Sequence, residues 1–126
     1  HEPGGTAEGL KRTSIVAGNE IGAKTGTTSN YSDGWFMGVT QKLVAGVWVG
    51  GDDRSIHFRS LALGQGAKMA MPAYAKFMEK VYADQSLAIE GYRKMPFIKP
   101  ENFVFDFSCN GRVAVDSTAT EAPLTQ

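Results

Sequence analysis

Five consecutive residues, Lys24-Thr25-Gly26-Thr27-Thr28, combine a cation, hydroxyl groups and a glycine within one short stretch. In a β-strand the side chains alternate between two faces, so Thr25 and Thr27 are predicted on one face and Lys24 and Gly26 on the other. Glycine weakens a strand interior and commonly marks a close approach by a ligand or another backbone. The pattern therefore suits a carboxylate-bearing peptide that pairs with the Thr27 main chain as an extra strand, with its carboxylate on the hydroxyls and a cation nearby.

Three strands are predicted to position this stretch. The first covers residues 21–27, the second 33–40 and the third 43–49, and the short connections favour an antiparallel meander. In the second strand Trp35, Met37 and Val39 alternate with Gly34, Phe36 and Gly38, so both faces carry bulk. This alternation predicts a central strand covered on both sides, with Trp35 and Trp48 in the core.

A helix is predicted over residues 66–83 as the cover of this sheet. Its apolar positions recur at helical spacing, at Met71, Tyr74, Phe77, Met78 and Val81. Pro72 should kink or restart the helix, because proline removes a backbone donor and clashes with the preceding turn. The sequence thus predicts an α+β fold with an antiparallel sheet and a packed C-terminal helix.

The two ends of the chain are predicted to contribute less. Thr6 resembles the N-cap of a short helix ending near Arg12. Residues 85–110 are predicted as an irregular extension, with a strand-like strip at 103–107, and residues 111–126 as a flexible tail. Cys109 is the only cysteine, so no internal disulfide can form, and a bystander role is favoured over an intermolecular bridge or lipidation.

Composition narrows the function classes. The 126 residues suffice for one domain or part of one, and 13 basic residues balance 13 acidic ones. This balance offers no attraction for nucleic acid or a membrane surface, and no apolar run reaches the length of a spanning helix. The chain shows no signal peptide and opens as if in mid-domain, so any anchor is expected upstream.

The wider sequence resembles a known family. The segments KTGTT, DGWFMG, LVAGVWVGGDD and ALGQGA are similar to the C-terminal part of the transpeptidase domain of bifunctional, class A penicillin-binding proteins. The resemblance covers roughly residues 4–84. It implies part of a penicillin-binding/serine β-lactamase-like transpeptidase fold, located at the outer face of the bacterial cytoplasmic membrane or in the periplasm, with a glycosyltransferase domain upstream.

The resemblance also implies roles for the first five residues. Lys24 would lie at the floor of the cleft and raise the positive potential that attracts a substrate carboxylate. Thr25 and Thr27 would hold that carboxylate, and the Thr27 N–H would complete an oxyanion hole. Gly26 would permit the close approach, and Thr28 would bind substrate together with Thr25, Gly26 and Thr27.

Two further motifs of the family are absent from the part of the chain that carries the resemblance. No serine is followed by lysine three positions later, so S-x-x-K is missing. The spacing S-x-N occurs only at Ser108-Cys109-Asn110, which lies outside residues 4–84. The chain alone is therefore expected to be inactive and to depend on the upstream half of the same domain. In the complete protein the resemblance implies cross-linking of peptidoglycan stem peptides and acylation by β-lactam antibiotics, without a cofactor.

Several alternatives stay open beside this interpretation. A β-lactamase or β-lactam sensor domain shares the Lys-Thr-Gly strand, and a noncatalytic peptide-binding or assembly module could use the same edge. A phosphate loop is disfavoured because Ala23 stands where that loop needs glycine. Asp52 and Asp53 with His57 make an incomplete metal site and are predicted to form a solvated turn.

Overall fold

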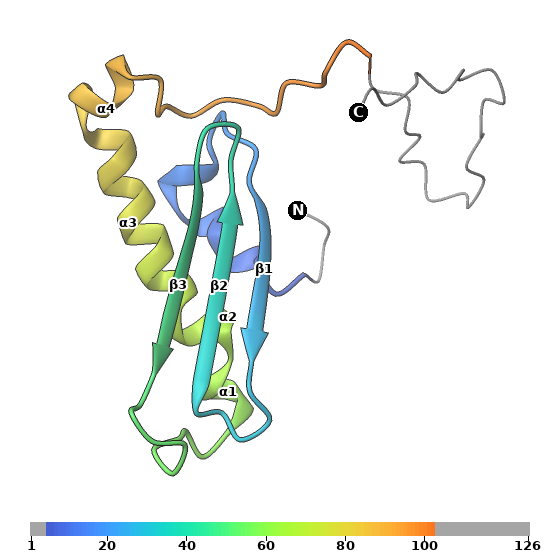
Figure 1. The fold of residues 1–126 in the computed structure, drawn as a ribbon, viewed down its shortest axis with the longest axis vertical. Coiled ribbons are helices and arrows are strands. Elements are labelled where there is room, and N and C mark those ends of the chain that lie inside the picture. The colour runs from blue at the N-terminus through green and yellow to red at the C-terminus, as the bar shows by residue number, and fades with distance from the viewer. Residues whose placement is uncertain (1–4, 103–126) are drawn as a thin grey trace, which may run out of the picture.

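The computed structural model describes residues 5–102, and its centre is a three-stranded antiparallel sheet. The strands are β1 (Gly22–Thr27), β2 (Asp33–Val39) and β3 (Val44–Gly50), in the order β1-β2-β3. Figure 1 shows them side by side, joined by two hairpins. The predicted meander and the central position of the second strand are confirmed.

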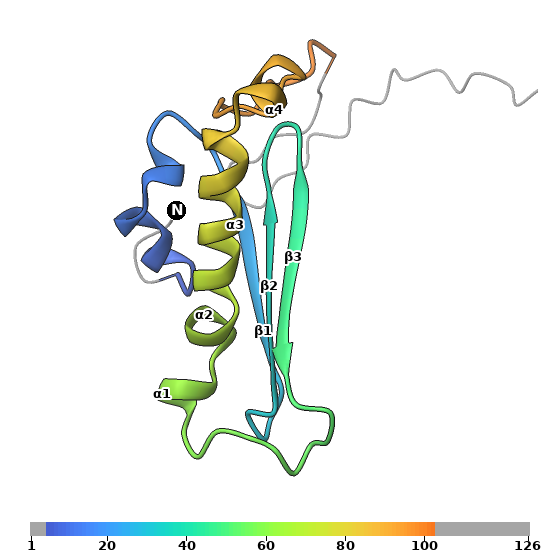
Figure 2. The same cartoon turned by 90° about the vertical axis from the view of Figure 1, so that its left-hand side faces the viewer.

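The helical segments lie together on one face of the sheet, except the last, which lies beyond the end of the strands (Figure 2). They are the 3-10 helices η1 (Glu8–Arg12) and η2 (Ser14–Val16) and the α-helices α1 (Leu61–Gly64), α2 (Gly66–Met69), α3 (Met71–Ala83) and α4 (Gln85–Ile89). The predicted helix is divided at Ala70, and Pro72 lies in the first turn of α3. Proline fits there because the first helical N–H groups have no intrahelical partner, so the predicted restart is confirmed.

The core lies between the sheet and these helices. Leu10, Ile15, Phe36, Tyr74 and Met78 are fully buried. The rings of Phe36 and Tyr74 are 4.9 Å apart between centroids, in a tilted arrangement that aromatic pairs favour. Strand β2 and helix α3 are therefore joined through their apolar faces, as the alternation and the helical spacing predict.

The opposite face of the sheet is open, which corrects the prediction of a strand covered on both sides. Trp35 is 48% exposed and Trp48 is 46% exposed, and Met37 and Val39 are also exposed. The prediction that both tryptophans belong to the core is therefore wrong for this chain. Alternation shows that both faces are apolar, but it does not show whether the same chain supplies a cover for each.

Smaller corrections concern a helix start, a short helix that was not predicted and the exposure of one side chain. Ala7, not Thr6, precedes η1, and no side chain caps this helix. Helix α4 lies within the segment predicted to be irregular. Its N-cap is Asp84, whose carboxylate accepts hydrogen bonds from the N–H groups of Ser86 and Leu87. Phe77, predicted in the apolar stripe, is 47% exposed.

After α4 an extended segment crosses the end of the sheet (Figure 1). The Met95 N–H donates to Asn19 Oδ1 at 3.2 Å, and the Ile98 N–H donates to Gln41 Oε1 at 2.9 Å. These bonds tie the segment to the turn before β1 and to the β2–β3 hairpin. The predicted strip at 103–107, Cys109 and the predicted tail at 111–126 lie outside the described residues.

Candidate functional site

Strand β1 is an edge strand, and its pairing determines which backbone groups are free. The Thr28 N–H donates to the Asp33 carbonyl at 3.1 Å, and facing pairs alternate between bonded and unbonded along an antiparallel ladder. Thr27, opposite Gly34, and Thr25, opposite Phe36, therefore occupy unbonded positions. Their N–H and C=O groups point away from β2, toward the free edge, where an added strand would pair.

Lys24 places its cation at this edge. Its side chain is exposed, and Nζ donates to the Thr25 carbonyl oxygen at 2.7 Å. Lys24 faces Met37 in the β1–β2 register, so it leaves the sheet on the open face together with the exposed apolar residues. Lys24 has no carboxylate partner among residues 5–102, so its positive charge is available to a ligand carboxylate at the edge.

Thr25 and Thr27 point to the other face, as the alternation predicts. The Thr25 hydroxyl lies 2.9 Å from the Thr6 hydroxyl. The Thr27 hydroxyl accepts a hydrogen bond from the Gly66 N–H at 3.0 Å, at the start of α2. Both hydroxyls are thus held by segments distant in sequence, and this brings the N-terminal segment and α2 to the same strand.

Gly26 lies next to Trp35 on the open face. A Cβ at this position would lie 3.3 Å from the Trp35 Cβ. On this face no backbone atom of the described chain lies within 4 Å of the added Cβ, and a shift of a few tenths of an ångström at Trp35 would accommodate alanine. The space above Gly26 is available for the close approach by a ligand that the sequence predicts.

The Thr28 side chain forms hydrogen bonds within the hairpin that follows β1. Its hydroxyl accepts a hydrogen bond from the Asp33 N–H at 3.0 Å and lies 3.2 Å from the Ser32 hydroxyl. Asn30 then links the hairpin to the loop after β3, because its Nδ2 donates to the Arg54 carbonyl at 3.0 Å. The Thr28 hydroxyl is thus directed into the turn that follows β1.

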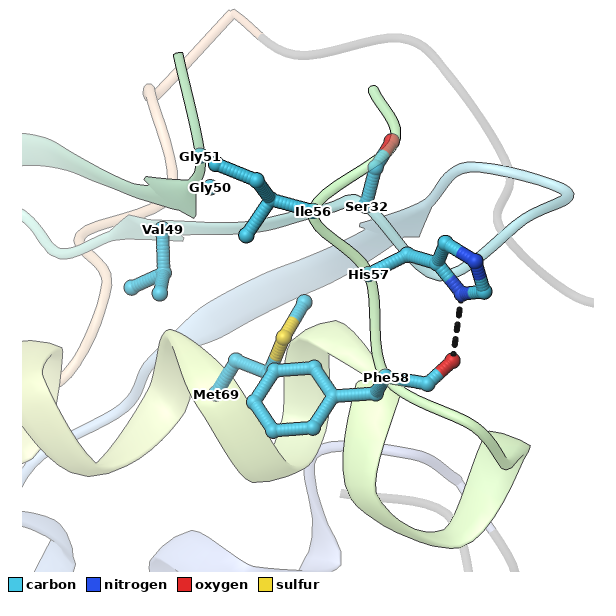
Figure 3. Close-up of a pocket in the computed structure, with 8 residues that line it drawn as sticks. All are labelled: Ser32, Val49, Gly50, Gly51, Ile56, His57, Phe58 and Met69. Atoms are coloured by element: carbon cyan, nitrogen blue, oxygen red, sulfur yellow. Dashed lines mark hydrogen bonds between the residues drawn. The ribbon is translucent and has the colours of Figure 1, made fainter. Parts of the chain in front are cut away.

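A cavity of about 300 Å³ lies at the end of the sheet beyond β3 (Figure 3). Its walls are mainly apolar, and its lining residues are Ser32, Val49, Gly50, Gly51, Ile56, His57, Phe58 and Met69. These residues come from a hairpin, a strand end, a loop and a helix, so no sequence motif announces the cavity. It does not include the predicted residues 24–28, which lie along β1.

The polar residues near this cavity agree with the prediction that Asp52 and Asp53 form a solvated turn. His57 Nδ1 donates to the Phe58 carbonyl at 3.0 Å, as Figure 3 shows. Asp53 is exposed, and the hydrogen bond from the Ser55 N–H lowers the pKa of its carboxyl group. The predicted solvated turn is therefore confirmed, and residues 5–102 contain no cluster of side chains suited to hold a metal ion.

Within that same range, no helix has both the length and the apolar character required to cross a membrane.

Comparison with known proteins finds relatives named "Penicillin-binding protein 1A". The chain is 30% identical over 122 residues to "Penicillin-binding protein 1A" of Aquifex aeolicus (strain VF5), a match that covers 94% of this chain and 16% of the relative. It is 33% identical over 117 residues to the protein of that name from Escherichia coli (strain K12), with 82% of this chain and 13% of the relative covered. The Haemophilus influenzae protein of that name is 38% identical over 80 residues, which cover 63% of this chain and 8% of the relative.

The chain therefore spans less than a fifth of the length of these relatives, since the covered share is 16% or below. No family model matches the chain, and no solved structure matches it.

Proposed function

Since this chain belongs to the penicillin-binding protein family, we propose that it supplies the substrate-binding edge of a serine D,D-transpeptidase that cross-links peptidoglycan. One observation carries this proposal. The backbone groups of Thr25 and Thr27 face the free edge of β1, directly beside the Lys24 ammonium. An extended peptide with a terminal carboxylate matches this arrangement, because its backbone can extend the sheet while its charge meets the cation.

The proposed reaction is an acyl transfer with a covalent intermediate. An activated serine attacks the carbonyl of the D-alanyl-D-alanine peptide bond, and the terminal D-alanine leaves as its amine takes a proton. The amine of a neighbouring stem peptide then attacks the ester and releases the serine. The Thr27 N–H stabilises the developing oxyanion, Thr25 and Thr27 bind the carboxylate, and Lys24 supplies positive potential. β-Lactams imitate the donor and stop at the acyl stage.

The serine must come from outside this chain, in which no S-x-x-K motif occurs. We place it in the upstream half of the same domain, which would cover the open face of the sheet. Two observations support a cover on the open face. Trp35, Met37 and Trp48 leave that face apolar and exposed, and Lys24 projects from it. An exposed apolar face of this kind is typical of a surface that another part of a protein covers.

In this proposal residues 1–84 complete the transpeptidase domain, residues 85–110 form an extension and residues 111–126 a tail. The complete protein would act at the outer face of the bacterial cytoplasmic membrane or in the periplasm, with a glycosyltransferase domain upstream. This chain alone would form no acyl-enzyme.

Labelling with a fluorescent penicillin tests the proposal. The complete protein should acquire one covalent label that depends on an upstream serine, and the isolated chain should acquire none. A slow release of label would fit a transpeptidase, whereas rapid turnover of the antibiotic would indicate a β-lactamase. Absence of labelling in the complete protein, together with retained binding of carboxyl-terminated peptides, would favour a noncatalytic peptide-binding module.

A further inference from the structure

The start of helix α2 rests directly on the β1 and β2 backbones. Gly66 is buried, and its N–H donates to Thr27 Oγ1 at 3.0 Å across 39 positions of sequence. The contact is therefore a tertiary one, between the predicted ligand-binding strand and the helical layer behind it. It reaches a side chain whose residue is itself exposed at the end of β1.

Only glycine fits at position 66. A Cβ there would overlap the backbone carbonyl oxygens of Trp35 and Gly26. On the facing strand, a Cβ at Gly34 would lie 3.1 Å from the Gly66 Cα. Because the opposing atoms belong to the sheet backbone, no side-chain rotation can relieve the overlap. The two glycines thus set how close α2 comes to β1, and this distance brings the Gly66 N–H within reach of Thr27.

This bond fixes the direction of the Thr27 hydroxyl. A threonine hydroxyl has one hydrogen to donate and two lone pairs that accept. The Gly66 N–H occupies one lone pair, so the hydroxyl hydrogen cannot point toward α2 and is left for another acceptor. Thr25 differs, because its partner is the Thr6 hydroxyl and either oxygen can be the donor. Of the two threonines, Thr27 is therefore the one whose hydroxyl hydrogen is left free to donate to a ligand.

We propose that Gly66 is a positioning residue, whose N–H presents the Thr27 hydroxyl as a hydrogen-bond donor to the carboxylate of the bound peptide or β-lactam. This inference rests on the proposed function. It adds a residue outside the Lys24–Thr28 stretch and assigns to it an effect on carboxylate recognition, not on the acyl-transfer chemistry.

A matched pair of glycine substitutions in the complete protein tests this assignment. Gly66→Ala should disturb the hydrogen bond between the Gly66 N–H and Thr27. Gly22→Ala is the control: Gly22 lies on the same strand as Thr27, and a Cβ at Gly22 meets nothing within 4 Å. Each variant is acylated by a penicillin and by its methyl ester, and the ratio of the two rates reports carboxylate recognition. Gly66→Ala should lower this ratio about tenfold, as expected for loss of a hydrogen bond to a charged group. Gly22→Ala should leave it unchanged.

A general folding defect would slow both antibiotics equally and leave the ratio unchanged, which would overturn the proposal. Combination with Thr27→Val sharpens the test, because valine keeps the shape and removes the hydroxyl. If Gly66 acts through Thr27, the double variant should have the ratio of Thr27→Val alone. Two full, additive losses would show that Gly66 acts by another route.

Hydrogen exchange provides a test that needs no change at Gly66. In the Thr27→Val variant the peptide containing the Gly66 amide should exchange faster than in the unaltered protein, because that N–H loses its acceptor. Unchanged protection would overturn the proposal even if Gly66→Ala fails to fold. Absence of any penicillin label on the unaltered protein would overturn the proposed function as well, so the two failures are distinguishable.

Discussion

The two faces of the sheet are both apolar, yet they differ in what covers them. On one face Phe36 is fully buried against Tyr74 and Met78 of α3. On the other face the paired residues Trp35 and Trp48 are each nearly half exposed. The first face carries the hydroxyls of Thr25 and Thr27, and the second carries Lys24.

In our proposal the covered face holds the site residues in place, whereas the open face takes part in binding the ligand. The covered face is complete within residues 5–102, and it holds the two threonines through Thr6 and Gly66. The open face leaves the lysine and a row of apolar side chains without a cover from the described chain. In our proposal the cleft forms where the open face and the β1 edge meet the upstream half of the domain. The predictions below test this division, in order of decreasing expected effect.

The largest effect is expected at Lys24, the cation of the open face. Lys24→Ala in the complete protein should reduce the rate of acylation by a fluorescent penicillin on the order of 10²- to 10³-fold, the loss typical of removing one electrostatic contact from an active site. Lys42→Ala, in the exposed β2–β3 hairpin, is the matched control and should have no effect. Equal rates for the two variants would remove Lys24 from the mechanism.

The next effect concerns the apolar part of the open face. If the upstream half covers it, Trp48→Ala in the complete protein should lower the free energy of unfolding by about 3 kcal/mol, the lower end of the range for a buried aromatic residue. Ile89→Ala, at a side chain that is 88% exposed, should change it by less than about 0.5 kcal/mol. Denaturant unfolding measures both. A neutral Trp48→Ala would mean that this face stays in solvent.

Thr25→Val tests the covered face where it reaches the edge. Loss of the hydroxyl should weaken the initial binding of penicillin about tenfold and leave the acylation step nearly unchanged, since the carboxylate contact forms before the chemistry. Kinetics over a range of antibiotic concentrations separate the two constants. A loss confined to the chemical step would contradict a carboxylate-binding role for Thr25.

Tyr74, deep in the covered face, offers the smallest effect at neutral pH, because its contribution appears only at high pH. Its hydroxyl is buried without a hydrogen-bond partner in the described chain, and burial raises the pKa of Tyr74 from 10.0 to about 12. The unfolded chain therefore loses this proton near pH 10 while the folded chain keeps it. The resulting contribution to stability is fully present below pH 10 and is lost as the pH rises toward 12.

Tyr74→Phe should remove this dependence on pH and should be close to neutral at pH 7, because it deletes an unsatisfied hydroxyl. The wild type should lose on the order of 2 kcal/mol between pH 10 and 12 that the variant retains. Urea midpoints across this range compare the two proteins. Identical pH profiles would show that burial does not raise the pKa of Tyr74 in the folded protein.

Local sequence patterns predict much of this fold because they depend on neighbours along the chain. The alternation in β2, the helical spacing of Tyr74, Met78 and Val81, and the restart at Pro72 all report local geometry. The exposure of Trp35 could not be predicted, because it depends on whether a distant segment is present. Helix α4 was missed although Asp84 gives a capping signal, because the helix has only five residues.

The candidate site shows the same limit. The stretch Lys24 to Thr28 is contiguous, so its strand and the alternation of its faces follow from sequence. The contact between Gly66 and Thr27 joins residues 39 positions apart, and no periodicity predicts such a pair. The cavity lined by Ser32, Phe58 and Met69 also arises only when separate segments meet.

Hydrogen exchange at the β1 edge tests the central claim most directly. The Thr25 and Thr27 amides face away from β2, so a ligand that extends the sheet should protect them. On acylation of the complete protein by a penicillin, we predict slower exchange in residues 24–28 and no change in residues 51–58 beside the cavity. Protection confined to residues 51–58, with unchanged exchange at Thr25 and Thr27, would contradict the claim that this edge binds the ligand.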